Sequence, residues 1–365
     1  MIEESVDGSK TMKFGCQIIA YGDVDLAVQH ACLAEKSGFD VVSLPDHLFH
    51  PIDERFMKGA PWDVYVTLGA IGVRTRRVRL MPAVSDILRR HPATVLHAIT
   101  TLDHLTGGRA ILGLGAGEAL NLEPIPDVKW DKPVTRLEEA LELIQRLESS
   151  KKEEPANFEG DFFKLRNAYL GFKPVKAKPI YVGGYGPKIK KLIAKFNCCW
   201  LPWLETPGTY RRGLRETEGY AKEAGETALR EHGLITMTSV LKDGEKAREA
   251  IAFRVKVILS LRRSLLRGLG CHSLAQRAVD MWKAGLGSDQ MNEIYSLARS
   301  IPDEAVEKTS IAGTPDECID RIEEFEKAGV RLLIVTPPVP QFKESMKFYK
   351  RHILPHFRPR GCDDG

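Results

Sequence analysis

Short apolar runs alternate with longer amphipathic stretches along most of the chain. In the first repeat, an apolar run at 13–19 is followed by apolar positions three and four apart over 25–36, by Gly38 and by a second apolar run at 40–44. The short runs predict strands, and the spacing of three and four predicts helices, with glycine as a stop. By the same pattern, further strands are expected at 78–84, 110–115, 180–183, 199–202, 234–241 and 332–336.

Eight strands that alternate with helices favour an α/β fold, a (β/α)8 TIM barrel formed as one domain by residues 1–365. Alternating strands and helices are typical of a parallel sheet, and eight repeats close most economically as a barrel. The ligand site of such a barrel lies on the loops after the carboxyl ends of the strands. The separating helices are expected at 62–73, 93–105, 134–147, 187–195 and 209–224.

Two segments are additional to the strands and helices of a minimal barrel. Within 157–172, Gly160 separates two apolar-aromatic runs and predicts an inserted hairpin. Residues 246–310 have helical periodicity and predict an inserted helical region that covers the barrel or contacts another subunit. Because Leu and Ile alternate with Arg in VKVILSLRRSLLRGLG, this region is also compatible with a calmodulin-like or membrane-surface helix.

Composition and charge narrow the class of protein. The 53 basic and 49 acidic side chains leave a net charge of +4, which indicates no general attraction to nucleic acid or to a membrane. Seven cysteines without a regular framework favour buried free thiols in a reducing cytoplasm, although the adjacent Cys198 and Cys199 leave a redox or metal pair open. The ten histidines are dispersed, so no metal site is predicted. We therefore expect a soluble cytoplasmic protein whose partner is a small molecule.

The segment SLPDHLFHP follows the second predicted strand and carries the first candidate residues, Asp46 and His47. This position is the mouth of a barrel, where a titratable pair can hold a ring nitrogen or stabilise a developing charge. In the alternative interpretation, Asp46 caps a loop and His47 packs beside it.

The second candidate segment, GRAILGLGAGEALN, is an apolar strand that opens into a glycine-rich turn at 108–121. Its glycines allow backbone to approach a flat ligand, and Glu118 projects from the turn as a possible acid or base. A dinucleotide fingerprint is the rival interpretation, but GLGAGEAL has only two of the three glycines of that motif.

The third candidate segment, IYVGGYGPKIKKL, leads from the fifth strand into a helix. Gly183, Gly184 and Gly186 precede that helix, and Lys188 lies in its first turn. Backbone amides at a helix start bind anions, so this loop predicts a phosphate site; a plain barrel loop remains the alternative. GTPDE at 313–317 also begins a helix, but its Thr and Glu are explained by capping alone.

Together these segments resemble the luciferase-like monooxygenase superfamily, in particular the branch that uses the deazaflavin coenzyme F420. The likeness covers most of the chain, and its most specific piece is VRLMPAVSDILRRHPATVLHAITTLDHLTGGRAILGLGAGEALN. The resemblance implies a barrel with the coenzyme in its central cavity. It also implies a non-prolyl cis peptide behind the ring, near Ala83–Val84 and just before Ser85, which puts these residues at the coenzyme.

The resemblance also assigns roles to the candidate residues. His47 and Glu118 correspond to the acid/base groups of the family's F420-dependent dehydrogenases, and Asp46 and Asn121 lie on the coenzyme side. The expected reaction is hydride transfer between F420 and a small organic or pterin-like substrate, as in methylenetetrahydromethanopterin reductase, by a homo-oligomer (dimer or tetramer).

The sequence departs from the family pattern at two places, which keeps alternatives open. The dehydrogenases have a tryptophan where this chain has Pro51 or Ile52, so their substrate contacts are not carried over. The reductases have GPGD where this chain has GAGE, which keeps the carboxylate but lengthens its reach. An FMN-dependent monooxygenase and a non-catalytic barrel that acts as a binding protein are the two alternatives.

Overall fold

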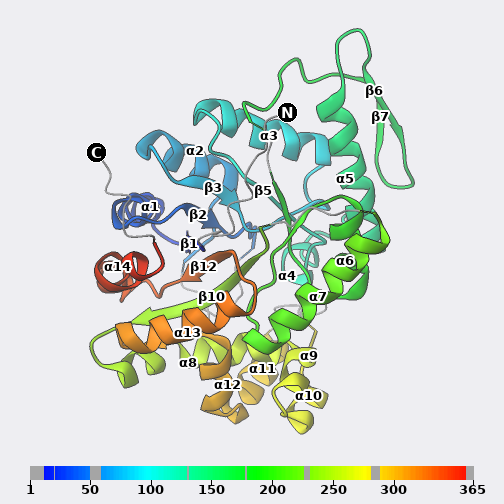
Figure 1. Cartoon of the computed structure of the whole chain (residues 1–365). Coiled ribbons are helices and arrows are strands. Elements are labelled where there is room, and N and C mark those ends of the chain that lie inside the picture. The colour runs from blue at the N-terminus through cyan, green and yellow to red at the C-terminus, as the bar shows by residue number, and fades with distance from the viewer. Residues whose placement is uncertain are drawn as a thin grey trace.

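Parallel strands occupy the centre of the molecule and helices surround them (Figure 1). The computed structural model describes residues 12–19, 21–49, 59–129, 131–176, 179–225, 231–280 and 288–358. The eight predicted strands are present with slightly different bounds. They are β1 (Lys13–Gln17), β2 (Val41–Leu44), β3 (Arg79–Pro82) with β4 (Ser85–Asp86), β5 (Leu112–Gly115), β8 (Ile180–Val182), β9 (Cys199–Trp200), β10 (Gly233–Val240) and β12 (Leu332–Thr336).

The strands form two sheets that meet at both edges. One sheet has the order β11-β10-β12-β1-β2-β3 and the other β4-β5-β8-β9. Single parallel bridges join them, from Leu80 to Ala110 and from Trp203 to Ile235. The neighbours therefore follow one another around a ring, in agreement with the predicted barrel architecture.

The third predicted strand is divided at the junction of the two sheets. β3 pairs with β2, whereas β4 pairs with β5, and the peptide bond between Ala83 and Val84, which separates β3 from β4, is cis. The structure thus confirms the cis peptide that the resemblance implies. The single strand predicted at 78–84 therefore corresponds to the region where the chain passes from one sheet to the other.

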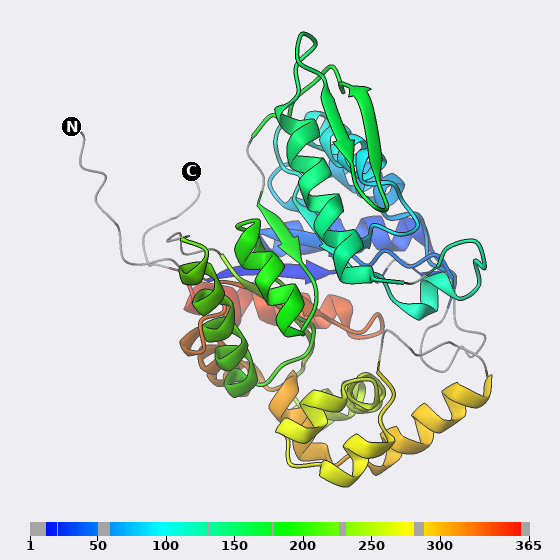
Figure 2. The same ribbon diagram turned by 90° about the vertical axis from the view of Figure 1, so that its right-hand side faces the viewer.

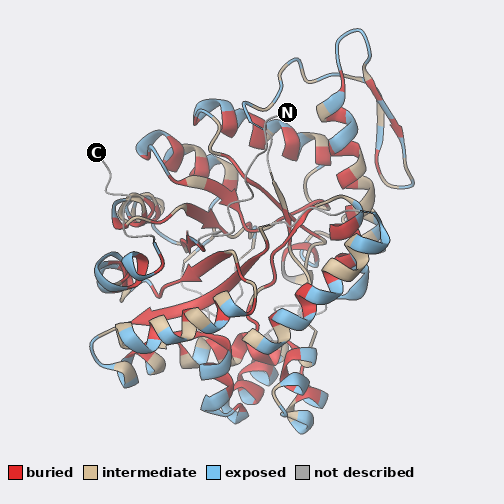
Figure 3. Cartoon of the chain, viewed as in Figure 1, coloured by how far each residue is buried: buried red, intermediate tan, exposed pale blue. Residues whose placement is uncertain are grey.

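Helices cover the outside of the ring, with apolar faces inward and polar faces toward solvent (Figure 3). Side chains inside the ring form a separate apolar cluster. Cys198 lies in the outer layer and Cys199 in the inner cluster, because consecutive strand residues point to opposite faces. The covering helices are α1 (Val24–Ser37), α2 (Val64–Arg74), α3 (Pro92–Leu105), α5 (Pro133–Ser149), α6 (Pro187–Lys195), α7 (Pro207–Glu223), α13 (Pro315–Lys327) and α14 (Phe342–Phe348), with η2 (Tyr349–Ile353) and α15 (Leu354–His356) after them.

The inserted hairpin is present, and a carboxylate ties it to the barrel. β6 (Ala156–Glu159) pairs antiparallel with β7 (Lys164–Ala168). Glu139 of α5 accepts hydrogen bonds from the three backbone amides of the turn, at residues 161, 162 and 163.

The inserted helices pack around an apolar cluster of their own, on the side of the barrel away from the hairpin (Figure 2). Val255, Ile258 and Leu259 are buried in VKVILSLRRSLLRGLG, so protein already covers its apolar face. A short strand that the sequence pattern does not predict, β11 (Ile311–Gly313), follows these helices and pairs with β10. The helices are α8 (Gly244–Ser260), α9 (Arg263–Gly268), α10 (His272–Arg277), α11 (Ser288–Ser300) and α12 (Asp303–Thr309).

Among the described helices, none combines the length and the apolar character that a membrane span requires.

The close approach of β5 to β3 predicts an effect of substitution at Gly113. A Cβ atom there would lie 2.1 Å from the carbonyl oxygen of Pro82, which is backbone and cannot rotate away. We expect Gly113→Ala to lower the free energy of unfolding by about 3 kcal/mol or more. Gly219→Ala is the control, because a Cβ at this helical position meets nothing within 4 Å; it should raise stability by up to ~1 kcal/mol. Equal denaturation midpoints for the two variants would contradict the prediction.

Candidate functional site

A cavity of about 610 Å³ opens at the carboxyl ends of the strands, where the barrel architecture predicts a ligand site. Its walls are mostly apolar, with a few polar side chains that converge on it. Both the size and the lining are typical of sites for small molecules and cofactors. Ten of the eleven residues that the sequence singles out line it: Asp46, His47, Ala83, Val84, Glu118, Asn121, Gly183, Gly184, Gly186 and Lys188.

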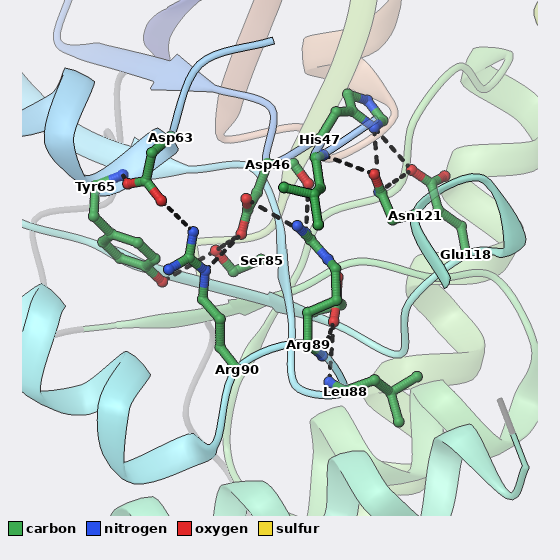
Figure 4. A network of polar contacts seen from close by, with 12 residues as sticks. Asp46, His47, Asp63, Tyr65, Ser85, Leu88, Arg89, Arg90, Glu118 and Asn121 are labelled. Atoms are coloured by element: carbon green, nitrogen blue, oxygen red, sulfur yellow. Dashed lines mark hydrogen bonds and ion pairs between the residues drawn. The ribbon is translucent and has the colours of Figure 1, made fainter. Parts of the chain in front are cut away.

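His47, Glu118 and Asn121 form one polar cluster in this cavity (Figure 4). His47 follows β2, Glu118 precedes the short helix α4 (Ala119–Leu122) and Asn121 lies within it. The Nδ1 atom of His47 is 3.1 Å from Oε1 of Glu118 and 3.3 Å from Nδ2 of Asn121. Nδ1 can therefore donate to Glu118 when it carries a proton and accept from Asn121 when it does not.

Asn121 fixes the geometry of this cluster. Its Nδ2 donates to Oε1 of Glu118 at 3.0 Å, and its Oδ1 accepts from the backbone amide of Leu48 at 2.9 Å. One buried amide thus connects the loop after β2 to the loop after β5. The family resemblance places Asn121 on the coenzyme side, and the structure also gives it this bridging position.

Glu118 is ionised near neutral pH. Burial alone would raise the pKa of its carboxyl, but the charge of His47, the hydrogen bond from His47 and the charge of Arg89 together lower the pKa from its ordinary value. The cluster therefore places a carboxylate beside the ring of His47, which is an arrangement that can hold a proton.

Asp46 is a buried carboxylate held by cations and a hydroxyl. Its Oδ2 accepts from Oγ of Ser85 at 2.7 Å, and the guanidinium groups of Arg89 and Arg90 lie 3.4 and 3.7 Å from its carboxylate oxygens. A buried charge requires such partners. Arg89 also donates to the backbone carbonyl of Asp46 at 2.7 Å, so this network fixes the turn that carries His47.

Ser85 does not lie in the cavity, where the resemblance places it beside the coenzyme. It is buried and does not line the cavity; it lies behind Asp46, where the hydroxyl of Tyr65 donates to its Oγ at 3.0 Å. Val84 faces the cavity, and the next residue, Ser85, points to the opposite side of the chain.

Val84 forms one wall of the cavity, and two glycines make room for it. A Cβ on Gly115 would lie 2.8 Å from Cγ2 of Val84, and a Cβ on Gly183 would lie 3.1 Å from the same atom. Gln17 supports the neighbouring residue, because its Nε2 donates to the carbonyl oxygen of Ala83 at 3.2 Å. The wall is therefore apolar, closely packed and suited to a flat ring.

The glycine loop after β8 lies on another side of the cavity. Gly186 is the N-cap of α6, and no side chain in the described part of the chain caps the first amides of this helix. The indole of Trp200 donates to the carbonyl oxygen of Gly184 at 2.8 Å and holds the loop against β9. Exposed backbone amides beside Lys188 suit an anionic group.

The cavity residues that were not found from the sequence include Tyr21, Trp203 and Arg254. Trp203 has a buried Nε1 with no hydrogen-bond partner among the described residues. Burial lowers the pKa of the Arg254 guanidinium on α8, although an arginine remains charged at neutral pH. Tyr21 follows β1, so the rule that barrel ligand sites lie after the strand ends could have found it. Arg254 comes from the inserted helices, and no motif near it in the sequence indicates a ligand site.

These residues fit a deazaflavin or flavin. The Val84 wall is apolar, the glycines leave space that side chains would fill, and the indole of Trp203 offers an unused donor. Within the described ranges, no three His, Cys, Asp or Glu side chains are grouped as a metal site. Pro51 and Ile52, which replace the tryptophan of the related dehydrogenases, lie outside the described residues.

Comparisons with known proteins agree with this geometry. A 5,10-methylenetetrahydromethanopterin reductase of Archaeoglobus fulgidus is 32% identical over 354 residues, 95% of this chain and 100% of that protein. The structure of an F420-dependent secondary alcohol dehydrogenase in complex with an F420-acetone adduct has a TM-score of 0.81 at 26% identity, over 95% of this chain and 99% of that one. The coenzyme F420-dependent tetrahydromethanopterin reductase of Methanopyrus kandleri has a TM-score of 0.76 at 25% identity, over 95% and 100% of the two chains.

The model of the luciferase-like monooxygenase family matches residues 10–332, which is most of the chain. The match includes all the loops that carry the cavity's polar cluster, the Val84 wall and the glycine loop. The chain therefore belongs to the luciferase-like monooxygenase family.

Proposed function

We propose that this protein is a coenzyme F420-dependent oxidoreductase that acts on a small organic or pterin-like substrate. The observation that carries the proposal is the His47, Glu118 and Asn121 cluster, which lies in the same cavity as the Val84 wall. The F420-dependent relatives over nearly the whole chain support the same reaction class.

The bound coenzyme supplies hydride transfer, and the protein supplies binding, alignment and proton handling. Val84, packed against Gly115 and Gly183, would contact the ring. The amides at the start of α6 and Lys188 would hold the coenzyme phosphate. Asp46 contributes by fixing the turn that carries His47.

His47 and Glu118 would hold and move the proton that accompanies the hydride. Nδ1 of His47 and Oε1 of Glu118 lie 3.1 Å apart, and the lowered pKa of Glu118 keeps its carboxyl ionised at rest. A carboxylate in this state can take a proton from the substrate or from a protonated His47 ring. Asn121 lies within hydrogen-bond distance of both groups.

The substrate side of the cavity would be formed by Tyr21, Trp203 and Arg254. The indole N–H of Trp203 and the guanidinium of Arg254 are donors, so this side favours a substrate with a carbonyl or another acceptor. Arg262 of the inserted region supports Trp203, because its guanidinium donates to the Trp203 carbonyl oxygen and pairs with Glu205 at 2.7 Å.

The homo-oligomeric state and the cytoplasmic location stay predictions. An exposed apolar stripe on α2 supports the first of them: Val66 and Val73 lie seven positions apart on one face and are 74% and 50% exposed. Such exposed patches are typical of contact surfaces.

We expect the protein to bind F420 more tightly than FMN. The test is a titration of the purified protein with each cofactor, followed by quenching of tryptophan fluorescence, since Trp203 lines the cavity. Equal or tighter binding of FMN would favour the monooxygenase alternative. Tight F420 binding without turnover of either methylenetetrahydromethanopterin or a secondary alcohol would favour the non-catalytic alternative.

Replacement of Glu118 tests the proton step. We expect Glu118→Gln to lower turnover roughly 100-fold, because the amide keeps the size of the side chain but cannot exchange the proton. The dissociation constant of F420 should stay within about twofold of the original value, since proton transfer, not binding, is lost. Steady-state rates with reduced F420 and methylenetetrahydromethanopterin, or with F420 and 2-propanol, provide the measurement.

The matched control is Glu123→Gln, an exposed carboxylate at the other end of α4. Its turnover should equal that of the original protein. Near-normal turnover of Glu118→Gln together with a lowered melting temperature would assign Glu118 a purely structural role.

A further inference from the structure

The chain makes a left-handed turn directly after Trp203, in the wall of the cavity. Leu204 has a φ of 58°, in a region that leucine rarely adopts. Its side chain is fully buried in the apolar cluster of the inserted helices, whereas Trp203, one residue earlier, lines the cavity. A costly backbone conformation of this kind persists only where the surrounding contacts hold it.

Arg262, the N-cap residue of α9, supplies such contacts. Its guanidinium donates to the carbonyl oxygen of Trp203 and, at 3.0 Å, to that of Leu204, and it pairs with Glu205 at 2.7 Å. The side chain of Arg262 is only 3% exposed, so these groups are its hydrogen-bond partners rather than water. One guanidinium thus binds three consecutive residues of the turn, which its planar fork of donors allows.

The same guanidinium contacts the glycine loop. Its Cζ atom lies 3.5 Å from the centre of the ring of Tyr185, the residue between Gly184 and Gly186. The Tyr185 hydroxyl donates to the carbonyl oxygen of Trp203 at 3.0 Å and accepts from its backbone amide at 3.2 Å. Arg262 and Tyr185 together therefore fix the backbone of Trp203 on both its polar groups.

The indole of Trp203 carries a donor that the described part of the chain does not use. Its Nε1 is buried, and no described residue accepts a hydrogen bond from it. A buried donor without an acceptor destabilises the protein unless a ligand supplies the acceptor. Because Trp203 lines the cavity, a molecule bound there can supply it.

We propose that Arg262 is a positioning residue, which holds the turn at 203–205 so that the indole N–H of Trp203 binds an acceptor atom of the substrate. This inference rests on the proposed function, which assigns Trp203 to the substrate side. Arg262 is not part of the cavity lining and acts through Trp203. The inserted region thereby controls how the substrate is held, through a residue that the substrate does not touch.

The experiment compares Arg262→Lys, Trp203→Phe and the double variant. Lysine keeps a positive charge beside Glu205 but lacks the planar fork that reaches two carbonyl oxygens. Phenylalanine keeps an aromatic ring in the wall but removes the indole N–H. The control is Arg263→Lys, because this neighbouring arginine also donates to a backbone carbonyl, but to that of Ala278 after α10.

We expect each of the two single variants to raise the substrate KM roughly tenfold, with kcat within about twofold of the original value, because a hydrogen bond to bound substrate is lost. The substrates are 2-propanol with F420 and methylenetetrahydromethanopterin with reduced F420. The double variant should have the KM of Trp203→Phe, since both residues act through one hydrogen bond. The control should keep the original KM even where its melting temperature falls.

A second measurement does not depend on turnover. The difference in fluorescence between a protein and its Trp203→Phe counterpart isolates the emission of Trp203. We expect Arg262→Lys to shift this emission to longer wavelength and to increase its quenching by acrylamide, because a loosened turn exposes the indole to water. Should Arg262→Lys fail to fold, Tyr185→Phe, which removes only the hydroxyl bonded to the Trp203 backbone, should shift the emission in the same direction.

Three results would overturn the proposal and leave F420 dependence intact: an unchanged Trp203 emission, an unchanged KM in Arg262→Lys, or additive increases of KM in the double variant. Turnover of neither substrate by the original protein would instead overturn the proposed function. The emission of Trp203 would in that case still decide whether Arg262 positions it. Melting temperatures, measured in parallel, show whether each variant is folded.

Discussion

Val84 packs against the bare backbones of Gly115 and Gly183 at the place where the third strand passes from one sheet to the other and the ligand cavity opens. A side chain on either glycine would occupy the space that Val84 fills. The division of the third strand follows from the same arrangement, since β3 and β4 pair with different neighbours on either side of Val84. The apolar wall of the cavity and the junction of the sheets are thus one feature.

The polar half of the cavity depends on a buried charge network behind it. Asp46 would be costly to bury alone, and Arg89, Arg90 and Ser85 stabilise it. Because Arg89 also holds the backbone of Asp46, the network positions His47, which reaches Glu118 across the loops. The position of the candidate acid/base pair therefore depends on residues that do not belong to the pair.

The inserted helices contribute to the site as well as to the covering of the barrel. Arg254 and Ile258 of α8 line the cavity, and the buried Arg262 supports the wall that Trp203 forms. These contributions lie on the side we assign to the substrate, whereas the coenzyme side is built from barrel loops. A barrel of this design can keep one coenzyme site and vary its substrate through the insertion.

The sequence by itself determined the eight strands, the inserted hairpin and the candidate residues His47, Glu118, Asn121 and the glycine loop. The strands, the hairpin, His47, Glu118 and the glycine loop follow from local periodicity and from the rule that barrel sites lie after strand ends, whereas Asn121 was assigned by the family resemblance. Only the tertiary structure decided that Ser85 lies behind Asp46 and that Arg254 and Trp203 enter the cavity. The physical reason is that such contacts join segments far apart in the chain, so they depend on strand order and helix packing, which periodicity does not encode.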